Sequence, residues 1–484
     1  MKKFCVFACA LIAALSAAFT GGCTKTESHR ASYDISCEYS DGLLIGSETV
    51  SFYNFTENSF KCLKFNLYGN AFRKGAKYSP ISEQYKRRAY YSGESYGETL
   101  VENVCSEGKE LKFEVCGEDM NILKVELEKE LFPEERAEVT IDFKVKLANV
   151  IARTGVNAET VNLGNFYPVL CGIENGAFYE CVYYSSGDPF FSDCADYNVK
   201  FSVDNKFVVA ASGETIEKTD SGNKAVYTFS LKNARSFALV IGEKFNVITD
   251  VTTGVTINYY YYKDASPEKS LKTAVEAIKF FGETYGEYPY KTFSVAETKF
   301  IQGGMEYPGL VYVSDELEEA AYREVVVHET AHQWWMAVVG NNETECGFLD
   351  EGLAEYSVIV FYDAHKEYGF TREQLVSSCE KTYKNFCTVY DKLYGKKDTS
   401  MTRSLKDFSS EYEYVNIAYV KPCLMYDAVR TGMGDAKFFG CLKKYYSTYK
   451  FLNAAPQDLS GVFEKAGTGA QEILEAFFAG KEVM

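Results

Sequence analysis

The stretch VVVHETAHQWWMAVV, residues 325–339, decides how the rest of the chain is interpreted. It contains His328, Glu329 and His332, and the two histidines are four residues apart. On a helix, positions i and i+4 lie one above the other on the same face, so both imidazoles can reach one metal ion. Glu329 is then within reach of a water on that metal. The alternative is an amphipathic helix with two core histidines.

Glu351 is the third candidate ligand, and eighteen residues separate it from His332 in the sequence FLDEGLAEYS. The whole chain has four histidines, so a chance match to this pattern is uncommon. A catalytic zinc ion takes three protein ligands of these types and keeps a fourth position open. We therefore predict one Zn²⁺ per chain, bound by His328, His332 and Glu351.

Length and charge limit the classes of protein to consider. A chain of 484 residues is too long for one ordinary core and predicts two or three domains. The composition is that of a globular protein, with 46% hydrophobic and 25% charged residues. The formal net charge of -17 argues against nucleic acid or an anionic membrane surface as a partner. It fits a cationic or amine-bearing ligand only weakly.

The N-terminus has the pattern of an export signal. Two lysines precede an apolar run over residues 4–19, and Thr-Gly-Gly then leads to Cys23. The run is short for a membrane-spanning helix, although an uncleaved anchor is an alternative. Small residues before a cysteine resemble a bacterial lipoprotein processing site, although Thr20 replaces the usual leucine. We predict a signal peptide over residues 1–23, a tether over residues 24–30, and an exported protein that is lipid-anchored through Cys23, or secreted if Cys23 is not lipidated.

Cysteine is frequent for an exported protein. Of fifteen cysteines, twelve lie between Cys37 and Cys441, at irregular spacing and without paired Cys-x-x-Cys clusters. This argues against a second zinc site built from thiolates. Disulfides and buried free thiols are both compatible with the pattern.

The first half of the chain alternates apolar and polar residues, which is typical of antiparallel strands. We predict a β-rich N-terminal domain, a sandwich or saddle, over residues 31–250. Its strands are expected at 48–55, 61–69, 122–131, 137–147, 197–213, 224–231 and 235–242.

The pattern changes between Asn246 and Asp264, after which helical spacing dominates. We predict a thermolysin-like, mostly α-helical catalytic domain over residues 251–484, so that the whole chain is an α+β multidomain protein. Its metal helix is expected to end near Gly340, and a second helix to run from about Asp350 towards His365. Further helices are expected at 266–286, 418–432, 435–450, 455–467 and 469–480, with strands at 255–262, 293–300 and 309–313.

The sequence GGMEY, residues 303–307, lies shortly before the metal helix. Paired glycines let another backbone approach closely, and an exposed strand can take an extended peptide at its edge. The Glu306 carboxylate beside that edge can pair with a terminal ammonium. The alternative is an ordinary turn or bulge.

Together these residues resemble the aminopeptidase N family of gluzincin zinc metallopeptidases. That family carries Gly-x-Met-Glu-Asn, then His-Glu-x-x-His, then a glutamate after eighteen residues; here these are GGMEY, HETAH and Glu351. The likeness continues through HQWW, VVGNN and LDEGLAEY, and more weakly through FNLYGNAF, GDPF and FFGCLKKYYSTYK. It covers nearly all of the chain beyond the signal, like a short bacterial lipoprotein-like member without the C-terminal helical domain of longer members. An open active site is expected in consequence.

The resemblance assigns roles to individual residues. It implies zinc binding by His328, His332 and Glu351, and it implies that Glu329 is the general base. It implies that Glu306 holds the free α-amine of a substrate whose backbone lies along Gly303, Gly304 and Met305.

The family also uses a tyrosine in a Tyr-x-Lys-Gly pattern to stabilise the oxyanion. The resemblance gives this role to Tyr419, in Tyr-Val-Lys-Pro, with a core tyrosine on an amphipathic helix as the alternative. Glu355 is either a hydrogen-bond partner of a ligand imidazole or a solvated helix residue. Trp334 and Trp335 are expected in the core.

Two positions depart from the family pattern, and one residue is not located. Tyr307 stands where the family has asparagine, and Pro422 where it has glycine. Both changes are expected to affect substrate positioning. A glutamate or glutamine from the β-rich domain often shares amine binding in this family, and no motif identifies it here.

The sequence thus predicts a zinc-dependent aminopeptidase that acts on peptides with a free N-terminus and has no nucleic-acid partner. Its only membrane contact is expected through the lipid at Cys23. The alternatives are a zinc endopeptidase with the same helix, against which GGMEY argues, and a catalytically weak surface peptide-binding lipoprotein, against which the complete set of site residues argues.

Overall fold

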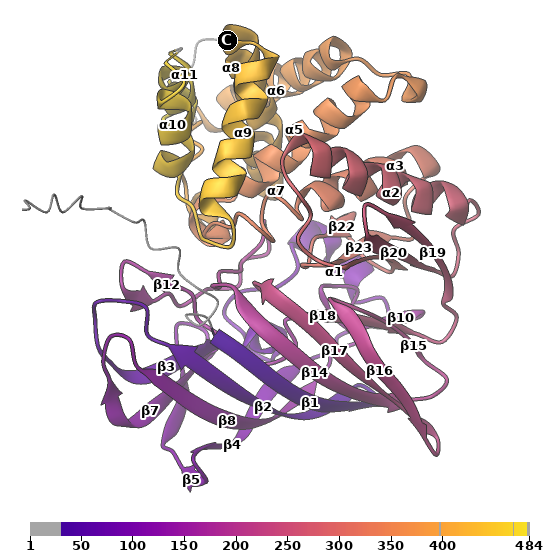
Figure 1. Cartoon of the computed structure of the whole chain (residues 1–484), viewed down its shortest axis with the longest axis vertical. Helices are drawn as coiled ribbons and strands as arrows, with labels where there is room; N and C mark the ends of the chain where they lie inside the picture. Colours follow the sequence, from indigo (N-terminus) through magenta and orange to yellow (C-terminus); the bar gives the residue numbers. More distant parts are fainter. Residues whose placement is uncertain (1–30, 396–397, 468, 482–484) are drawn as a thin grey trace, which may run out of the picture.

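The computed structural model describes residues 31–395, 398–467 and 469–481 (Figure 1). A β-rich region comes first in the chain, and a mostly helical region follows it. The predicted fold class is therefore confirmed. The predicted signal peptide, the tether with His29, and Cys23 lie outside the described residues.

An eight-stranded sheet forms the base of the molecule in Figure 1. Its first strand, which is not among the predicted ones, buries every second residue: Tyr33, Ile35, Cys37 and Tyr39 are all buried. The first strand, β1, pairs in parallel with β14 and antiparallel with β2. In spatial order the strands are β16 (Glu214–Ser221), β17 (Lys224–Ala234), β14 (Ala195–Asp204), β1 (Ala31–Ser40), β2 (Leu43–Tyr53), β8 (Arg136–Lys146), β4 (Glu98–Ser106) and β5 (Lys109–Glu110).

Smaller sheets complete the β-rich region. Strands β10 and β18 are buried at all five positions, as expected of strands covered on both faces. The segment 197–213, predicted as one strand, is instead two strands in different sheets, because a turn after Asp204 redirects the chain. One sheet has the order β15 (Val208–Ala211), β18 (Ala238–Gly242), β10 (Thr160–Gly164) and β9 (Thr154–Val156). A second has the order β11 (Val169–Leu170), β3 (Phe60–Asn66), β7 (Ile122–Leu131) and β6 (Phe113–Cys116). A third pairs β12 (Ile173–Glu174) with β13 (Ala177–Phe178).

A five-stranded sheet opens the second region. Its order is β19 (Asn246–Thr252), β20 (Val255–Tyr261), β21 (Thr292–Thr298), β23 (Leu310–Ser314) and β22 (Gly304–Met305). Sheet membership therefore changes between β18 and β19, while the domain boundary at residue 250 stays a prediction. Strand β22 is the edge strand and pairs with β23.

Helices make up most of the second region. Helix α2 begins at Pro267 after Ser266, as its start signal predicts. The helices of this region are α2 (Pro267–Thr284), α3 (Glu319–Ala331), α4 (Glu343–Cys346), α5 (Phe348–Ala364), α6 (Arg372–Tyr394), α7 (Glu411–Val415), α8 (Lys421–Met433), α9 (Asp435–Tyr449), α10 (Pro456–Glu464) and α11 (Ala470–Phe478). The β-rich region contains one α-helix, α1 (Glu83–Ala89), and a 3-10 helix over Tyr68–Phe72, neither of which the alternating pattern predicted.

The metal helix is shorter than the sequence predicts. Helix α3 ends at Ala331 rather than near Gly340, and Met336 has a φ of 144° that no helix accommodates. The chain leaves the helix so that Trp334 and Trp335 can be buried, as predicted for both; their indole nitrogens donate to the Gly286 carbonyl and the Ser357 hydroxyl. The apolar run over residues 325–339 thus reflects burial rather than the length of a helix.

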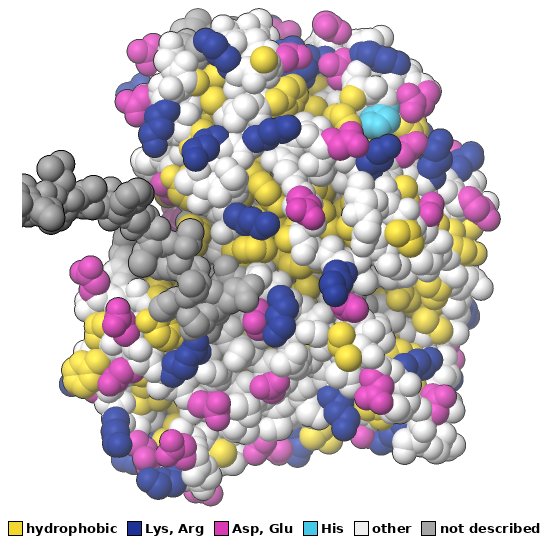
Figure 2. Space-filling view, in the orientation of Figure 1, with side chains coloured by type: hydrophobic (Ala, Val, Ile, Leu, Met, Phe, Trp, Pro, Cys, Tyr) yellow, Lys and Arg dark blue, Asp and Glu magenta, His cyan; other side chains and the backbone are white. Residues whose placement is uncertain are grey.

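The surface carries charges of both signs. On the face shown in Figure 2, acidic and basic side chains are interspersed among polar and apolar ones. Within the described part of the chain, no helix is both long enough and apolar enough to span a bilayer.

One buried acid in the β-rich region has no evident partner. Glu48 on β2 is fully buried, and neither of its carboxylate oxygens accepts a hydrogen bond within the described structure. Burial raises the pKa of Glu48 well above its usual value, so the folded protein keeps the proton.

We expect Glu48→Met to stabilise the protein, by about 1–3 kcal/mol at neutral pH, because it removes an unsatisfied buried polar group. Above about pH 4.3 the unfolded chain loses the Glu48 proton and the folded chain retains it. Stability therefore falls as pH rises, and the gain from the substitution grows with pH. Urea denaturation at about pH 5 and pH 8 measures both effects. The exposed Glu138→Met is the matched control, and a gain that shrinks with pH would contradict the interpretation.

Candidate metal centre

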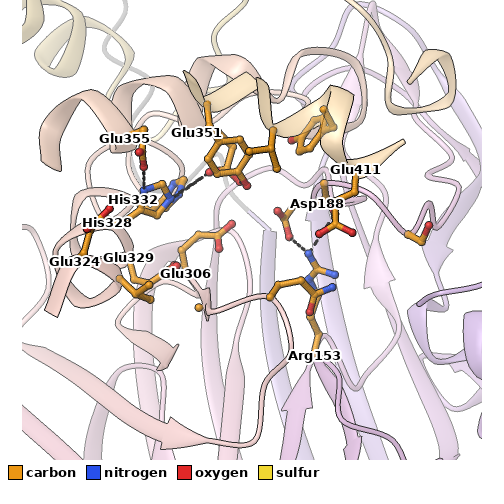
Figure 3. Close-up of a pocket in the computed structure, with 18 residues that line it drawn as sticks. Arg153, Asp188, Glu306, Glu324, His328, Glu329, His332, Glu351, Glu355 and Glu411 are labelled. Atoms are coloured by element: carbon orange, nitrogen blue, oxygen red, sulfur yellow. Dashed lines mark hydrogen bonds and ion pairs between the residues drawn. The ribbon is translucent and has the colours of Figure 1, made fainter. Parts of the chain in front are cut away.

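Helices α3 and α5 bring the three predicted ligands together (Figure 3). His328 lies in the last turn of α3, and His332 caps that helix with a backbone that is still helical, so the two rings remain one turn apart. Glu351 lies in the first turn of α5. The two Nε2 atoms are 3.0 Å apart, and Glu351 Oε2 is 3.3 Å from His328 Nε2 and 3.2 Å from His332 Nε2.

Hydrogen bonds on the far side of each ring fix the orientation of both histidines. His332 Nδ1 donates to the Trp335 carbonyl at 2.9 Å, and His328 Nδ1 donates to Glu355 Oε2 at 3.0 Å. With Nδ1 protonated, each neutral imidazole presents the Nε2 lone pair to the common point. Glu355, for which the sequence left two interpretations open, therefore contacts a ligand imidazole.

The donor set fits a divalent cation. Two lone pairs and a carboxylate oxygen this close repel one another unless a positive charge lies between them, and His332 and Glu351 are almost completely buried. Burial lowers the pKa of His332, but without a metal the Glu351 and Glu306 carboxylates outweigh it and raise that pKa to about 10, so a proton supplies the positive charge that a bound metal would otherwise supply. Burial likewise raises the pKa of Glu351, and the two histidines bring it below its usual value. Two imidazoles and one carboxylate with an open side suit Zn²⁺.

Glu329 lies beside the ligands, with one carboxylate oxygen free of hydrogen-bond partners in the described structure. Burial raises the pKa of Glu329 to about 7. Its other oxygen packs on the backbone of β22, where a Cβ on Gly304 would lie 2.1 Å from Glu329 Oε1. Glycine at this position is therefore what lets the carboxylate and the strand edge lie in contact.

Glu306 follows β22 and faces the same pocket (Figure 3). It is 4% exposed, its Oε1 has no hydrogen-bond partner among the described residues, and its carboxylate lies within 4.8 Å of groups of Glu329 and His332. Burial raises the pKa of Glu306 well above its usual value. An unpartnered buried carboxylate beside a metal site is suited to receive a cationic group.

Of the three predicted backbone contacts, Gly304 lines the pocket, and Gly303 and Met305 do not. The Met305 side chain is buried, and its sulfur accepts from Arg153 Nε at 3.1 Å. Gly303 has a φ of 100°, a conformation that favours glycine, and its carbonyl accepts from the Ser314 amide.

Tyr419 lies over the metal ligands from a π-helical turn, Asn416–Val420, between α7 and α8. Its hydroxyl donates to Glu351 Oε1 at 2.5 Å, and its ring stacks on His328 with centroids 5.9 Å apart. Single π-helical turns occur often at functional sites because they redirect side chains. The structure thus places Tyr419 at the site, and its role in stabilising an oxyanion stays a prediction.

The two departures from the family pattern lie behind the pocket rather than in it. The Tyr307 side chain is buried in a core cluster, with its ring centroid 5.1 Å from that of Tyr312. Pro422 is the second residue of α8, directly after the π-helical turn, and a Cβ on Gly352 would lie 2.4 Å from it.

The sequence did not locate Asp188 and Arg153, a buried ion pair from the β-rich region that lines the pocket (Figure 3). Asp188 Oδ1 accepts from Arg153 Nη2 at 2.5 Å, and its carboxylate lies within 4.8 Å of those of Glu306 and Glu351. The sequence signal for Asp188 was the GDPF segment, which resembles the family pattern but has no motif that indicates a chemical role.

Arg235, also from the β-rich region, holds the loop that follows α3. Its guanidinium donates to the carbonyls of Met336 and Leu452, at 2.7 and 2.6 Å, and to that of Ser192 at 3.1 Å. The Met336 carbonyl is next to that of Trp335, which orients His332. Contacts across so many residues leave no local pattern, so no sequence signal identifies this arginine.

Comparison with known proteins agrees with this geometry. Residues 269–479 match the family described as the Peptidase family M1 domain. Aminopeptidase N of Lactobacillus delbrueckii subsp. lactis is 24% identical over 397 residues, which are 74% of this chain and 43% of that protein. Probable aminopeptidase 1 of Saccharolobus solfataricus is 23% identical over 406 residues, which are 77% of this chain and 47% of that protein. The chain thus spans less than half the length of these relatives.

Among solved structures, an M1 zinc metallopeptidase from Deinococcus radiodurans shares the fold, with a TM-score of 0.68 and 17% identity. The match covers 94% of this chain and 96% of that one. Residues 269–479 are therefore a peptidase family M1 domain, and the predicted resemblance to the aminopeptidase N family is confirmed.

Proposed function

We propose that this protein is a zinc-dependent aminopeptidase that removes single N-terminal residues from peptides. The observation that carries the proposal is the place of Glu306, a buried and unpartnered carboxylate in the same pocket as His328, His332 and Glu351. A free α-ammonium is the cation that every peptide offers at its N-terminus. The peptidase family M1 domain and the aminopeptidases that match the chain support this reaction class.

A zinc ion bound by these ligands would lower the pKa of a water and polarise the scissile carbonyl. Glu329 accepts the proton of the attacking water and returns it to the departing amine. The Tyr419 hydroxyl turns from Glu351 to donate a hydrogen bond to the oxyanion of the tetrahedral intermediate.

The substrate is held at its backbone and its amine. An extended peptide adds to the edge of the five-stranded sheet along β22, where Gly303 and Gly304 leave room for its main chain. Glu306 binds the α-ammonium, and Asp188 supplies a second carboxylate beside it. Asp188 and Arg153 are both less than 9% exposed, so buried side chains close the pocket beyond the amine.

This closed end disfavours the endopeptidase alternative. A peptide bound in mid-chain would have to continue past Glu306 and Asp188, through buried side chains, and it would leave both carboxylates without a cation. The binding-protein alternative does not explain why the Glu329 carboxylate, the proposed general base, packs against β22, the strand edge proposed to bind the substrate.

We further propose that the protein is exported and anchored to the membrane by a lipid on Cys23. The basic start, the apolar run over residues 4–19 and the small residues before Cys23 support this.

We expect Glu329→Gln to lower kcat by about 10²–10⁴-fold, because general base catalysis is lost. The zinc content, measured by metal analysis of the purified protein, should stay at one ion per chain. Glu318→Gln, an exposed change at the start of α3, is the control for helix effects. A Glu329→Gln enzyme with unaltered kcat would show that another residue is the base.

The amine-binding role of Glu306 predicts that N-acetylated peptides are not cleaved, while the same peptides with a free amine are. Glu306→Gln should lower kcat/KM for the free-amine peptides by about 10²-fold, mostly through KM, because it removes a buried charge partner. Mass spectrometry of the products distinguishes stepwise trimming from internal cleavage. Internal cleavage of acetylated peptides would establish the endopeptidase alternative instead.

The lipid anchor predicts that cells expressing the full chain incorporate a labelled fatty acid into the protein. Cys23→Ala should abolish the label and release the protein from the membrane fraction. Label retained in Cys23→Ala, or a wild-type protein without label, would refute the anchor at this residue.

A further inference from the structure

The pocket carries more negative charge than the proposed reaction requires. Its volume is about 240 Å³, and its lining contains one arginine, two histidines and seven carboxylates: Asp188, Glu306, Glu324, Glu329, Glu351, Glu355 and Glu411. Five of these carboxylates have functions in the preceding sections. Glu324 and Glu411 have none.

The two unassigned carboxylates lie at opposite ends of the pocket (Figure 3). Glu324 lies one turn before His328 on α3, on the side of the metal ligands away from Glu306. Glu411, at the start of α7, lies on the side of Glu306 and Asp188. In the proposed reaction the first residue of the substrate extends from the metal ligands towards Glu306, so Glu411 is on the side of the first residue and Glu324 is on the leaving side.

The charge of Glu411 is not neutralised within the protein. Its Oε2 accepts hydrogen bonds from two neutral groups of the β-rich region, Ser82 Oγ at 3.1 Å and Gln84 Nε2 at 2.7 Å. In the described part of the chain no lysine or arginine forms an ion pair with it. The one arginine of the pocket, Arg153, is already paired with Asp188 and also donates to the Gly187 carbonyl.

The lining of the pocket suits a long side chain with a charged end. Tyr414 and Val415 line the pocket together with Glu411 and add apolar surface to it, and Gly187 lies in close contact with the Tyr414 ring. Aliphatic stems of lysine and arginine pack on surfaces of this kind while their cationic ends reach a polar group.

We propose that the pocket selects peptides whose first residue is lysine or arginine, and that Glu411 is the residue that determines this preference. The inference rests on the proposed function and names its substrate class. Glu411 pairs with the side-chain cation of the first residue, while Glu306 pairs with its α-ammonium. Two separate carboxylates thus recognise two charges of one residue.

The test compares aminoacyl-coumarin reporters of arginine and citrulline on the zinc-loaded full chain. Citrulline has the shape of arginine without its charge, so the ratio of the two kcat/KM values isolates the charge. We expect the wild-type ratio to favour arginine about tenfold, as one partly exposed ion pair would give, and to fall as salt is added. Glu411→Gln, which keeps the hydrogen-bond acceptor, should bring the ratio close to one, mainly through the KM for arginine.

Glu83→Gln is the matched control, because Glu83 is a neighbouring carboxylate on α1 that does not line the pocket; it should leave the ratio unchanged. Thermal unfolding of Glu411→Gln checks that the fold is kept. Calorimetric binding of arginine amide and citrulline amide to Glu329→Gln gives the same ratio without turnover. A wild-type ratio near one, or a ratio that Glu411→Gln leaves unchanged, would overturn the preference. If the citrulline reporter is hydrolysed in either of these two cases, the aminopeptidase function holds and only the preference for a cationic first residue is refuted.

Discussion

The close approach of two imidazole nitrogens and one carboxylate oxygen, all within 3.3 Å, is the constraint on which the rest of the site depends. Such an arrangement is unfavourable without a cation, so the protein must hold each ligand in place by other contacts. Helix α3 sets the spacing of the histidines, α5 presents Glu351, and hydrogen bonds from the rings to Glu355 and the Trp335 carbonyl fix the ring orientations. The stability of the fold thus offsets the repulsion at its centre.

The site divides its work between helices and strands. In the proposed reaction, helices provide the metal ligands, the base and the tyrosine, and a short strand edge with the β-rich region provides the groups that bind the substrate. Glu306 and Asp188 come from different halves of the chain and lie within 4.8 Å of one group of Glu351. The proposed recognition of the substrate's end therefore depends on groups from both regions rather than from either one.

What the sequence could predict was local. The spacing of His328 and His332 follows from helix geometry, and the alternation in the first half follows from strands with one buried face. Both were correct for this reason. The end of α3 was wrong because burial of two tryptophans and helix continuation leave the same apolar pattern. Asp188, Arg153 and Arg235 act on groups far away in the sequence, and a single sequence carries no signal of such contacts.

The contacts of Arg235 also bear on the order in which the molecule is assembled. Its acceptors at Met336 and Leu452 follow it by 101 and 217 residues, so they do not yet exist when the β-rich region has been synthesised. Arg235 can therefore link the loop after α3 to the segment after α9 only once the chain has grown beyond Leu452. The segment that carries both histidines is therefore synthesised more than a hundred residues before the last of the backbone groups that Arg235 binds.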